Sequence, residues 1–536
     1  MSNAESPRSS ETKDLGLSAL DSSEVPSPTS SPGLSLDVVV FTCGALVMVY
    51  EIVGSRILAP FIGTSTYVWT SLIGVILAAL SLGYWIGGRV ADERPNAKVL
   101  AAAILAAAGL VSVTTIAKEV VLSTIASIPA WLEVKAVIAA LILFAPASVA
   151  LGFVTPFAVR LRMASVGDAG KTVGRLYALS TIGSIAGTFA AGFFLLPFVG
   201  SVRTLYFIAG GLFVLSLLLV PFSFSRKHVS VLLVLLLGIG TSELWRFMLW
   251  RSHEMIDLDT EFSRVQIFRA NDPTTQRPIR ALSFDPYSTQ SAMFLDGPPD
   301  ELVFEYTKFY HLVRAANPDF RRTLMIGGAG YSFPKSFLAE YPSAELEVVE
   351  IDPAMTRIAR EHFSLADDPR LTIRHQDGRV FLNNAETARY DAVLMDAFGS
   401  LFSIPFHLTT VEAVRHIDRV LAPDGIAIFN VGSAITGPAS SFLQAEFRTY
   451  QQVFPYVHLF KVRPERPDTD LQNLIVLACK QKCLPTSRTD NPAADPLITS
   501  LTSRLHTTPF LLIRPTLTDD LAPTERYSSI ANSFWR

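Results

Sequence analysis

Charge and cysteine are both scarce in this chain. Charged residues make up only 17% of the 536 residues, whereas an average soluble domain contains roughly 25%. The net charge of −3 leaves no positive surplus that could hold nucleic acid, so no such partner is expected. Three cysteines are too few for a disulfide framework, and Cys479 with Cys483 supplies too few ligands for a metal site. Because 49% of the residues are hydrophobic, the chain resembles neither a disordered polypeptide nor an ordinary soluble enzyme.

The first 35 residues lack any apolar period. They are rich in Ser, Pro and small polar residues, so residues 1–35 are expected to form a disordered tail. The first long apolar run starts only after this tail, and no basic region at the N-terminus leads into it. The segment therefore does not have the pattern of a cleavable secretory signal.

Long apolar runs dominate residues 36–250. Each run approaches the length of about 20 residues that crosses a bilayer. Small residues such as Gly183 and Gly187 lie inside the runs, which suits close helix packing in lipid. The sequence therefore predicts a multi-pass α-helical membrane domain of about six or seven helices, with the lipid bilayer as a partner. The runs are Leu36–Tyr50 (continuing toward Phe61), Tyr67–Val90, Val99–Ala117, Ala136–Val159, Val173–Pro197, Val202–Phe222 and Val229–Trp250.

Basic residues in the loops indicate the orientation of these helices. They cluster after the second, fourth and sixth runs, which places those loops and the N-terminus in the cytoplasm. The basic residues are Arg89, Arg94, Lys98, Arg160, Arg162, Lys171, Arg175, Arg226 and Lys227. The last run is interrupted by Glu243 and Arg246, so six or seven crossings are both possible. Seven crossings would put the C-terminal half outside the cell, and six would keep it inside.

From about Asp257 the sequence has the pattern of a soluble α/β protein. Three short strands are expected in a small β-subdomain over residues 257–320: Arg264–Ala270, Arg280–Phe284 and Ser291–Leu295. Strand-like and helical stretches then alternate over residues 321–483, which predicts a parallel, Rossmann-like methyltransferase-type sheet covered on both faces. Its expected strands are Thr323–Ile326, Leu346–Ile351, Leu371–His375, Tyr390–Met395, Gly425–Val431 and Asn473–Ala478. Residues 484–536 form a C-terminal extension in which Leu517–Pro523 is expected to be a loop.

A glycine cluster follows the first strand of this predicted sheet, and an acid follows the second strand. Glycines let the backbone approach a ligand, and an acid about 20 residues later can bind ribose hydroxyls. A simple structural turn would also explain the glycines taken alone. The residues concerned are Gly327, Gly328, Gly330, Glu350 and Asp352.

Two further acids close the next strands, Asp377 with Gly378 and then Asp396. Acids therefore stand at the carboxyl ends of three consecutive strands, the edge where open α/β sheets bind ligands. Capping of a following helix is the alternative for each acid. The pattern favours an adenosyl ligand without phosphate, with Glu350 on the ribose and Asp377 on the adenine amino group. No basic residue follows in the glycine loop, so a phosphate cradle is unsupported; a dinucleotide remains an alternative.

These motifs resemble those of the polyamine aminopropyltransferases, the spermidine synthases. The resemblance covers roughly residues 257–479, and the apolar half with the Leu517–Pro523 segment resembles the membrane-fused branch of that family. The matching segments are Gly327–Gly330, Val348–Pro353, Asp377–Arg379, Tyr390–Asp396, Ser263–Gln266 and Leu282–Asp285 with Gln290.

The resemblance implies a reaction and a set of residue roles. Members of the family transfer an aminopropyl group from decarboxylated S-adenosylmethionine, a co-substrate rather than a permanently bound cofactor, to a small amine. Asp396 would accept a proton from the amine as the catalytic residue. Gln266, Gln290 and Tyr306 would line the amine pocket, and the glycine loop, Glu350, Asp352 and the Asp377-Gly378 pair would bind the adenosyl group. Relatives are commonly dimers or tetramers, so a homo-oligomer is expected.

Two positions depart from the family pattern. Gly330 stands where the family has the aspartate that holds the donor's amino group, and Gly399 stands where it has a second aspartate. Two alternatives therefore stay open: a methyltransferase that uses S-adenosylmethionine, and a non-catalytic transporter or sensor that binds a nucleoside or polyamine. Both adenosyl donors are cytoplasmic metabolites, so we expect a multi-pass cell-membrane protein whose soluble half faces the cytoplasm.

Overall fold

The computed structural model describes residues 36–128, 130–163, 169–220, 225–286, 288–397, 405–484 and 495–533. The expected disordered tail, residues 1–35, lies outside this part of the chain. So does Gly399, one of the two positions that depart from the family pattern.

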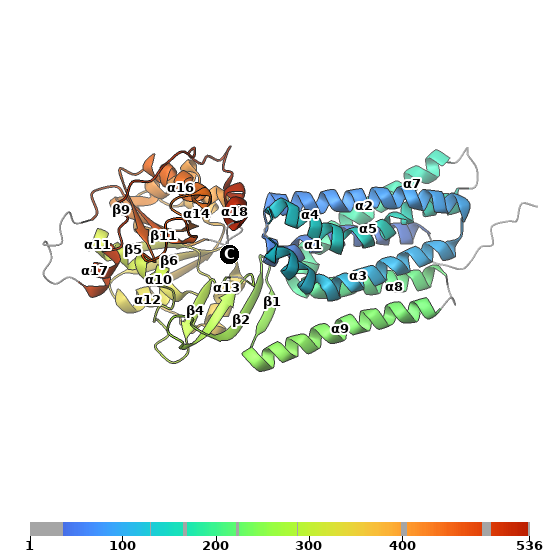
Figure 1. The fold of residues 1–536 in the computed structure, drawn as a ribbon, viewed down its shortest axis with the longest axis horizontal. Helices are drawn as coiled ribbons and strands as arrows, with labels where there is room; N and C mark the ends of the chain where they lie inside the picture. The colour runs from blue at the N-terminus through green and yellow to red at the C-terminus, as the bar shows by residue number, and fades with distance from the viewer. Residues whose placement is uncertain are drawn as a thin grey trace, which may run out of the picture.

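Long helices run lengthwise beside one another in the first half of the chain (Figure 1). Within the described residues, six helices are long and apolar enough to cross a membrane, or up to seven if one bent pair, Leu132–Leu143 with Ala145–Arg162, forms a single span. This agrees with the predicted number of helices. The bounds are α1 (Leu36–Ile62), α2 (Thr66–Glu93), α3 (Ala97–Ser127), α4 (Leu132–Leu143), α5 (Ala145–Gly152), α6 (Val154–Arg162), α7 (Ala169–Ala190) with a π-helical continuation (Ala191–Val199), α8 (Ser201–Leu219) and α9 (Arg226–His253).

Small residues bring α1 and α7 into backbone contact. A Cβ atom on Gly183 would lie 2.9 Å from the carbonyl carbon of Phe41, and one on Gly187 would lie 2.7 Å from Cα of Ala45. Neither distance leaves room for a side chain. The two glycines that the sequence singled out therefore lie at the contact between α7 and α1 and let the two backbones approach closely.

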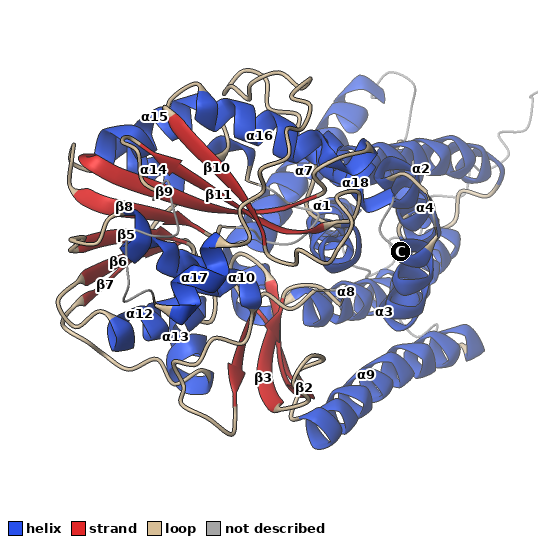
Figure 2. Cartoon of the chain, turned by 60° about the vertical axis from the view of Figure 1, so that its left-hand side comes forward, coloured by secondary structure: helices blue, strands red, loops and turns tan. Residues whose placement is uncertain are grey.

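Two sheets form the second half. A four-stranded antiparallel sheet has the order β1-β2-β3-β4, and a seven-stranded sheet has the order β10-β11-β9-β8-β5-β6-β7 (Figure 2). Strands β9, β8, β5, β6 and β7 are parallel, while β10 and β11 are antiparallel. The predicted fold class is confirmed. The bounds are β1 (Ile256–Asp259), β2 (Arg264–Asn271), β3 (Pro278–Ser283), β4 (Ser291–Phe294), β5 (Arg322–Ile326), β6 (Glu345–Glu350), β7 (Leu371–His375), β8 (Tyr390–Met395), β9 (Leu421–Ser433), β10 (Tyr456–Lys461) and β11 (Gln472–Cys479).

Helices cover both faces of the larger sheet. In Figure 1, α14 and α16 lie on one side of it and α12 and α13 on the other. The central strands are buried on both faces, which explains their nearly continuous apolar sequences. The bounds are α10 (Glu305–Lys308), α11 (Val313–Ala316), α12 (Ser332–Glu340), α13 (Pro353–His362), α14 (Gly378–Asn384), α15 (Val411–Val420), α16 (Ser441–Gln451), α17 (Pro496–Thr502) and α18 (Thr524–Ser533), with 3₁₀ turns at Phe309–Leu312 and Phe406–Leu408.

The two halves meet at one end of the helical half, beside β1, β2 and α18 (Figure 1). Arg56 of α1 donates to the carbonyl oxygens of Thr260 and Glu261 in the β1–β2 turn. Arg264 of β2 donates to Glu119 of α3 at 3.3 Å. The α2–α3 connection and the first turns of α7 and α9 lie at the opposite end (Figure 1). The predicted basic loops are therefore remote from the α/β half.

Candidate functional site

The glycine loop begins at the carboxyl end of β5. Gly327 has φ +96°, a conformation that side chains disfavour. A Cβ atom there would also lie 2.8 Å from the carbonyl carbon of Asp396. Glycine at this position therefore lets the ends of β5 and β8 approach one another. Ala329 (φ +43°) and Tyr331 (φ +54°) are also left-handed, so the loop holds several unfavourable backbone conformations in one place.

Glu350 holds this loop from the end of the neighbouring strand. Its Oε2 accepts hydrogen bonds from the backbone N–H groups of Gly328 (2.8 Å) and Ala329 (3.1 Å). Its Oε1 accepts one from the N–H of Asp352 at 3.0 Å. Burial raises the pKa of Glu350, and these backbone donors partly oppose the rise. Glu350, which is predicted to bind the ribose, thus also supports the glycine loop.

Two of the other acids at this edge, Asp352 and Asp377, cap helices. Asp352 Oδ1 accepts from the N–H of Ala354 at the start of α13, and Asp377 Oδ1 accepts from the N–H groups of Arg379 and Val380 at the start of α14. Capping, left open by the sequence, therefore accounts for one oxygen of each acid. Asp352 Oδ2 is buried and accepts no hydrogen bond from the described residues.

The second oxygen of Asp377 faces a histidine across the edge of the sheet. Asp377 Oδ2 lies 3.3 Å from Nε2 of His407. Gly378, which follows, packs against the end of β5, because a Cβ atom there would lie 2.6 Å from Ile326 Cγ2. The start of α14 is therefore held close to the glycine loop.

Asp396, directly after β8, is a buried carboxyl with polar neighbours. The hydroxyl of Tyr306 donates to Oδ2 at 3.4 Å, and Asn430 Nδ2 donates to Oδ1 at 3.3 Å. Asn473 Nδ2 in turn donates to Asn430 Oδ1 at 3.1 Å. Burial raises the pKa of Asp396 to about 6, although bonds from Asn430, Tyr310 and Tyr306 lower it. A carboxyl with this pKa can accept a proton near neutral pH.

Sequence reasoning found Tyr306 and Asp396 but missed two residues beside them. Tyr310 follows Tyr306 by one helical turn; its hydroxyl donates to the carbonyl oxygen of Met395 at 3.5 Å and lowers the pKa of the adjacent Asp396. Asn430 is a polar residue inside the apolar strand β9, and this interruption was a signal that could have identified it. The pair Asn473–Asn430 fixes the amide that faces the carboxylate.

The two predicted amine-pocket glutamines have partners inside the β-subdomain. Gln290 Oε1 accepts from the N–H of Phe284, and its Nε2 donates to Ser288 Oγ at 2.8 Å. Gln266 is the register partner of Asp257 on the neighbouring strand β1 and helps to lower the pKa of that carboxyl. The structure thus brings Tyr306 to Asp396, while the amine-binding role of Gln266 and Gln290 stays a prediction.

Ser291 occupies the space beside Gly330. A Cβ atom on Gly330 would clash with Ser291 Oγ and would lie 2.8 Å from Ser291 Cβ. The same hydroxyl lies 2.8 Å from Ser332 Oγ, at the start of α12. No acidic side chain fits at position 330 while this serine pair is in place. The glycine at position 330, where the family has an aspartate, therefore fits the space that Ser291 and Ser332 leave.

This contact predicts a coupled effect on stability. Gly330→Ala is expected to destabilise the protein by about 1–3 kcal/mol, the usual cost of overpacking. In a Ser291→Gly background the same substitution should cost much less, because the clashing side chain is gone. Thermal unfolding of the four variants of this double-mutant cycle measures the coupling. An equal cost of Gly330→Ala in both backgrounds would show that Ser291 does not restrict position 330.

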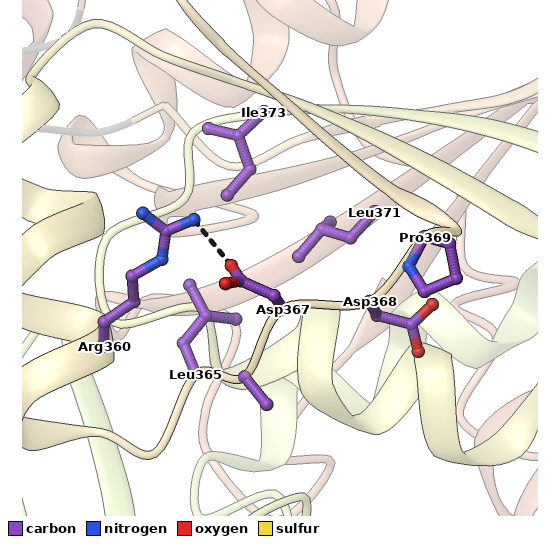
Figure 3. A pocket seen from close by; sticks show the side chains of 8 residues that line it. Arg360, Leu365, Asp367, Asp368, Pro369, Leu371 and Ile373 are labelled. Carbon is purple, nitrogen blue, oxygen red and sulfur yellow. Dashed lines mark hydrogen bonds and ion pairs between the residues drawn. The ribbon is translucent and has the colours of Figure 1, made fainter.

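A surface cavity of about 420 Å³ lies away from these residues, between the end of α13 and the start of β7 (Figure 3). Its lining includes Arg360, Asp367 and Asp368. Asp367 pairs with Arg360 at 2.8 Å, and Asp368 pairs with Arg370 at 2.7 Å. This cavity opens at the amino end of β7, the opposite edge from the glycine loop, and its acids are already paired. We therefore assign the site to the carboxyl edge.

Known proteins resemble both halves of the chain. Residues 304–463 match the spermine/spermidine synthase domain. The chain is 26% identical to a polyamine aminopropyltransferase of Vibrio vulnificus over 257 residues, which are 47% of this chain and 82% of that protein. It is 27% identical to polyamine aminopropyltransferase 1 of Streptomyces coelicolor over 459 residues, 78% of this chain and 81% of that one, so this likeness includes helical residues. A probable spermidine synthase from Corynebacterium glutamicum, solved by crystallography, aligns with a TM-score of 0.37 and 26% identity over 42% of this chain and 80% of that chain.

Proposed function

We propose, from the premise that this chain belongs to the polyamine aminopropyltransferase (spermidine synthase) family, that it transfers an aminopropyl group to a small amine. The proposed donor is decarboxylated S-adenosylmethionine, bound as a co-substrate. The apolar helices of the first half are proposed to anchor the enzyme in the cell membrane, because six of them have the length and composition of membrane spans.

The observation that carries the proposal is the buried carboxyl of Asp396 beside the glycine loop. Gly327 and Asp396 are in backbone contact, so a nucleoside held by the loop has its reacting end near this carboxyl. Glu350 is one strand away and holds the same loop. The edge of the sheet therefore combines a support for the nucleoside with one proton acceptor whose pKa is raised to about 6.

The proposed reaction is a substitution at carbon. The nitrogen of an uncharged amine attacks the carbon next to the sulfonium, the carbon–sulfur bond breaks, and methylthioadenosine leaves with that electron pair. The nitrogen gains a bond to carbon and loses a proton, which Asp396 accepts. Tyr306 and Asn430 donate to the two oxygens of this carboxylate and so fix its orientation. General-base assistance of this kind is typically worth about 10²–10⁴-fold in rate.

A methyltransferase that uses S-adenosylmethionine is the second candidate. The Ser291 contact at Gly330 favours this function, because it leaves no room for the carboxylate that would bind the amino group of the decarboxylated donor. Without that carboxylate, selection for the decarboxylated donor is weaker. Product analysis separates the two functions. The purified full-length protein is incubated with each donor and a panel of diamines. Methylthioadenosine release supports aminopropyl transfer, and S-adenosylhomocysteine release supports methyl transfer.

The side of the membrane that holds the α/β half is a separate question. The predicted basic loops lie at the end of the helices remote from this half, and positive loops are typically cytoplasmic. Cys479 and Cys483 form a disulfide bond, which is typical of oxidising compartments. The proposed activity instead requires the cytoplasmic side, where both adenosyl donors are made. Binding of a nucleoside or polyamine without turnover is the candidate function that an outer location would favour.

Cysteine labelling distinguishes these arrangements. The proposed activity predicts that a membrane-impermeant thiol reagent labels Glu465→Cys, on the exposed surface of the α/β half, only after cells are permeabilised. Pro95→Cys, in the exposed α2–α3 connection, serves as the matched position at the opposite end of the helices. Labelling of Glu465→Cys in intact cells would contradict a cytoplasmic aminopropyltransferase.

A further inference from the structure

The C-terminal segment returns to the adenosyl edge of the sheet. Thr518 and Leu521 form a tight turn, closed by backbone hydrogen bonds of 3.1 and 3.0 Å between them. Between them, Asp519 contacts Arg379, which lies 140 residues earlier at the start of α14. This turn is the centre of the Leu517–Pro523 segment, which the proposed mechanism does not use.

Asp519 and Arg379 form a two-point ion pair. Asp519 Oδ2 accepts from Arg379 Nη2 at 2.7 Å, and Oδ1 accepts from Nη1 at 3.3 Å. The side chain of Arg379 is only 14% exposed, so water can stabilise its charge less than that of a surface arginine, and Asp519 supplies a compensating negative charge. Two parallel bonds between guanidinium and carboxylate also fix direction as well as position.

The same two side chains hold the segment that carries His407. Arg379 Nη1 donates to the carbonyl oxygen of His407 at 2.8 Å and to Thr410 Oγ1 at 3.0 Å. Thr410 Oγ1 donates to Asp519 Oδ1 at 2.6 Å. The N–H of Asp519 donates to Glu412 Oε2 at 3.0 Å, in the first turn of α15. Asp519 thus joins the start of α14, the 3₁₀ turn Phe406–Leu408 and the start of α15.

Arg379 and His407 each contact one oxygen of the Asp377 carboxylate. Arg379 follows it by two residues and gives its N–H to Asp377 Oδ1. His407, whose carbonyl is held by Arg379, faces Asp377 Oδ2 at 3.3 Å. The ion pair formed by the C-terminal segment therefore holds the backbone of His407, whose ring faces the second oxygen of Asp377.

We infer that Asp519 is a positioning residue of the adenosyl site, acting through Arg379 on Asp377 and His407. The inference rests on the proposed function, because it takes the carboxyl edge to be the nucleoside site. The C-terminal segment is then a part of the donor pocket rather than a passive extension. Asp519 is 47% exposed, and an asparagine there keeps an amide oxygen that can accept from the mostly buried Arg379, so Asp519→Asn should affect binding much more than stability.

The test compares Asp519→Asn with Asp520→Asn in the full-length protein. Asp520 is the neighbouring exposed acid and serves as a matched control. Methylthioadenosine is the probe for calorimetry, and turnover is measured with decarboxylated S-adenosylmethionine. Asp519→Asn is expected to raise the Kd for the nucleoside and the KM for the donor by about tenfold, as for the loss of one hydrogen bond to a charged group. The kcat at saturating donor and the Tm should stay near those of Asp520→Asn.

Asp519→Glu, which keeps the charge, should recover most of the lost affinity. The inference is overturned if Asp519→Asn binds methylthioadenosine as tightly as Asp520→Asn does, or if its kcat and Tm fall together with its affinity. If the unmodified protein binds no adenosyl nucleoside, the proposed function fails and this inference fails with it. If the unmodified protein binds the nucleoside and Asp519→Asn has no effect, the role of Asp519 is wrong and the proposed function stands.

Discussion

Replacing Asp396 with Asn is expected to lower turnover by about 10²–10⁴-fold, the contribution of a well-placed general base. The amide is nearly the same size, so the contacts with Tyr306 and Asn430 can largely persist. What it cannot do is accept the proton that the attacking amine loses. Affinity for methylthioadenosine should change little, because the glycine loop and Glu350 are untouched. Single-turnover rates and calorimetry on the same preparation measure both quantities.

Asp391→Asn is the matched control for this substitution. Asp391 lies at the other end of β8 and accepts from the backbone N–H groups of Arg321 and Arg322, away from the glycine loop. Its loss should affect stability and leave the chemical step near its normal rate. An Asp396→Asn variant with undiminished rate would remove Asp396 from the mechanism.

The pH dependence gives a second readout of the same group. Burial raises the pKa of Asp396 to about 6 from the ordinary aspartate value near 4. Only the ionised carboxylate accepts a proton, so the rate should rise as the pH increases through about 6 and then level off with respect to this group. In the Asp396→Asn variant this rise should be absent from the residual rate.

Glu350→Gln is expected to weaken nucleoside binding by about tenfold or more. The carboxylate accepts three backbone hydrogen bonds, from Gly328, Ala329 and Asp352, and hydrogen bonds to a charged acceptor are worth about 1.5–3 kcal/mol. A glutamine keeps one acceptor oxygen and introduces a donor toward these N–H groups. The conformation of the loop and the proposed contact with the ribose should therefore be lost together. Calorimetry with methylthioadenosine measures the loss.

Glu345→Gln provides the comparison on the same strand. Glu345 is exposed at the amino end of β6, one strand length from the glycine loop. The Glu345→Gln variant should bind the nucleoside as tightly as the unmodified protein does. Unchanged affinity in Glu350→Gln would count against the ribose role and against the support that Glu350 gives to the loop.

Most strands of the larger sheet could be predicted from sequence because their apolar runs end abruptly. The central strand Tyr390–Met395 has the predicted bounds, and so does the edge strand Leu371–His375. Strands β1 and β10 were missed. Asp257 and Asp259 take up half of the four residues of β1, and β10 is buried only at Leu459 and Phe460, so neither strand has a continuous apolar run.

Some residues of the site could be predicted from local sequence patterns, whereas others reach the site from distant segments. The glycine loop and the acids at the strand ends are local patterns that sequence spacing places at one edge of the sheet. Asn430 and Asp519 reach that edge from segments far along the chain, through strand pairing and a returning C-terminal turn. The polar interruption of β9 marks Asn430 in the sequence, but the contacts of both residues depend on how the whole chain folds back.

Calorimetric titration of the full-length protein with methylthioadenosine tests the proposed nucleoside site most directly. We expect saturable binding of one nucleoside per chain that weakens at least tenfold in Glu350→Gln and stays intact in Asp396→Asn. Absence of binding by the unmodified protein, or binding that Glu350→Gln leaves unchanged, would contradict a nucleoside site at the carboxyl edge of this sheet.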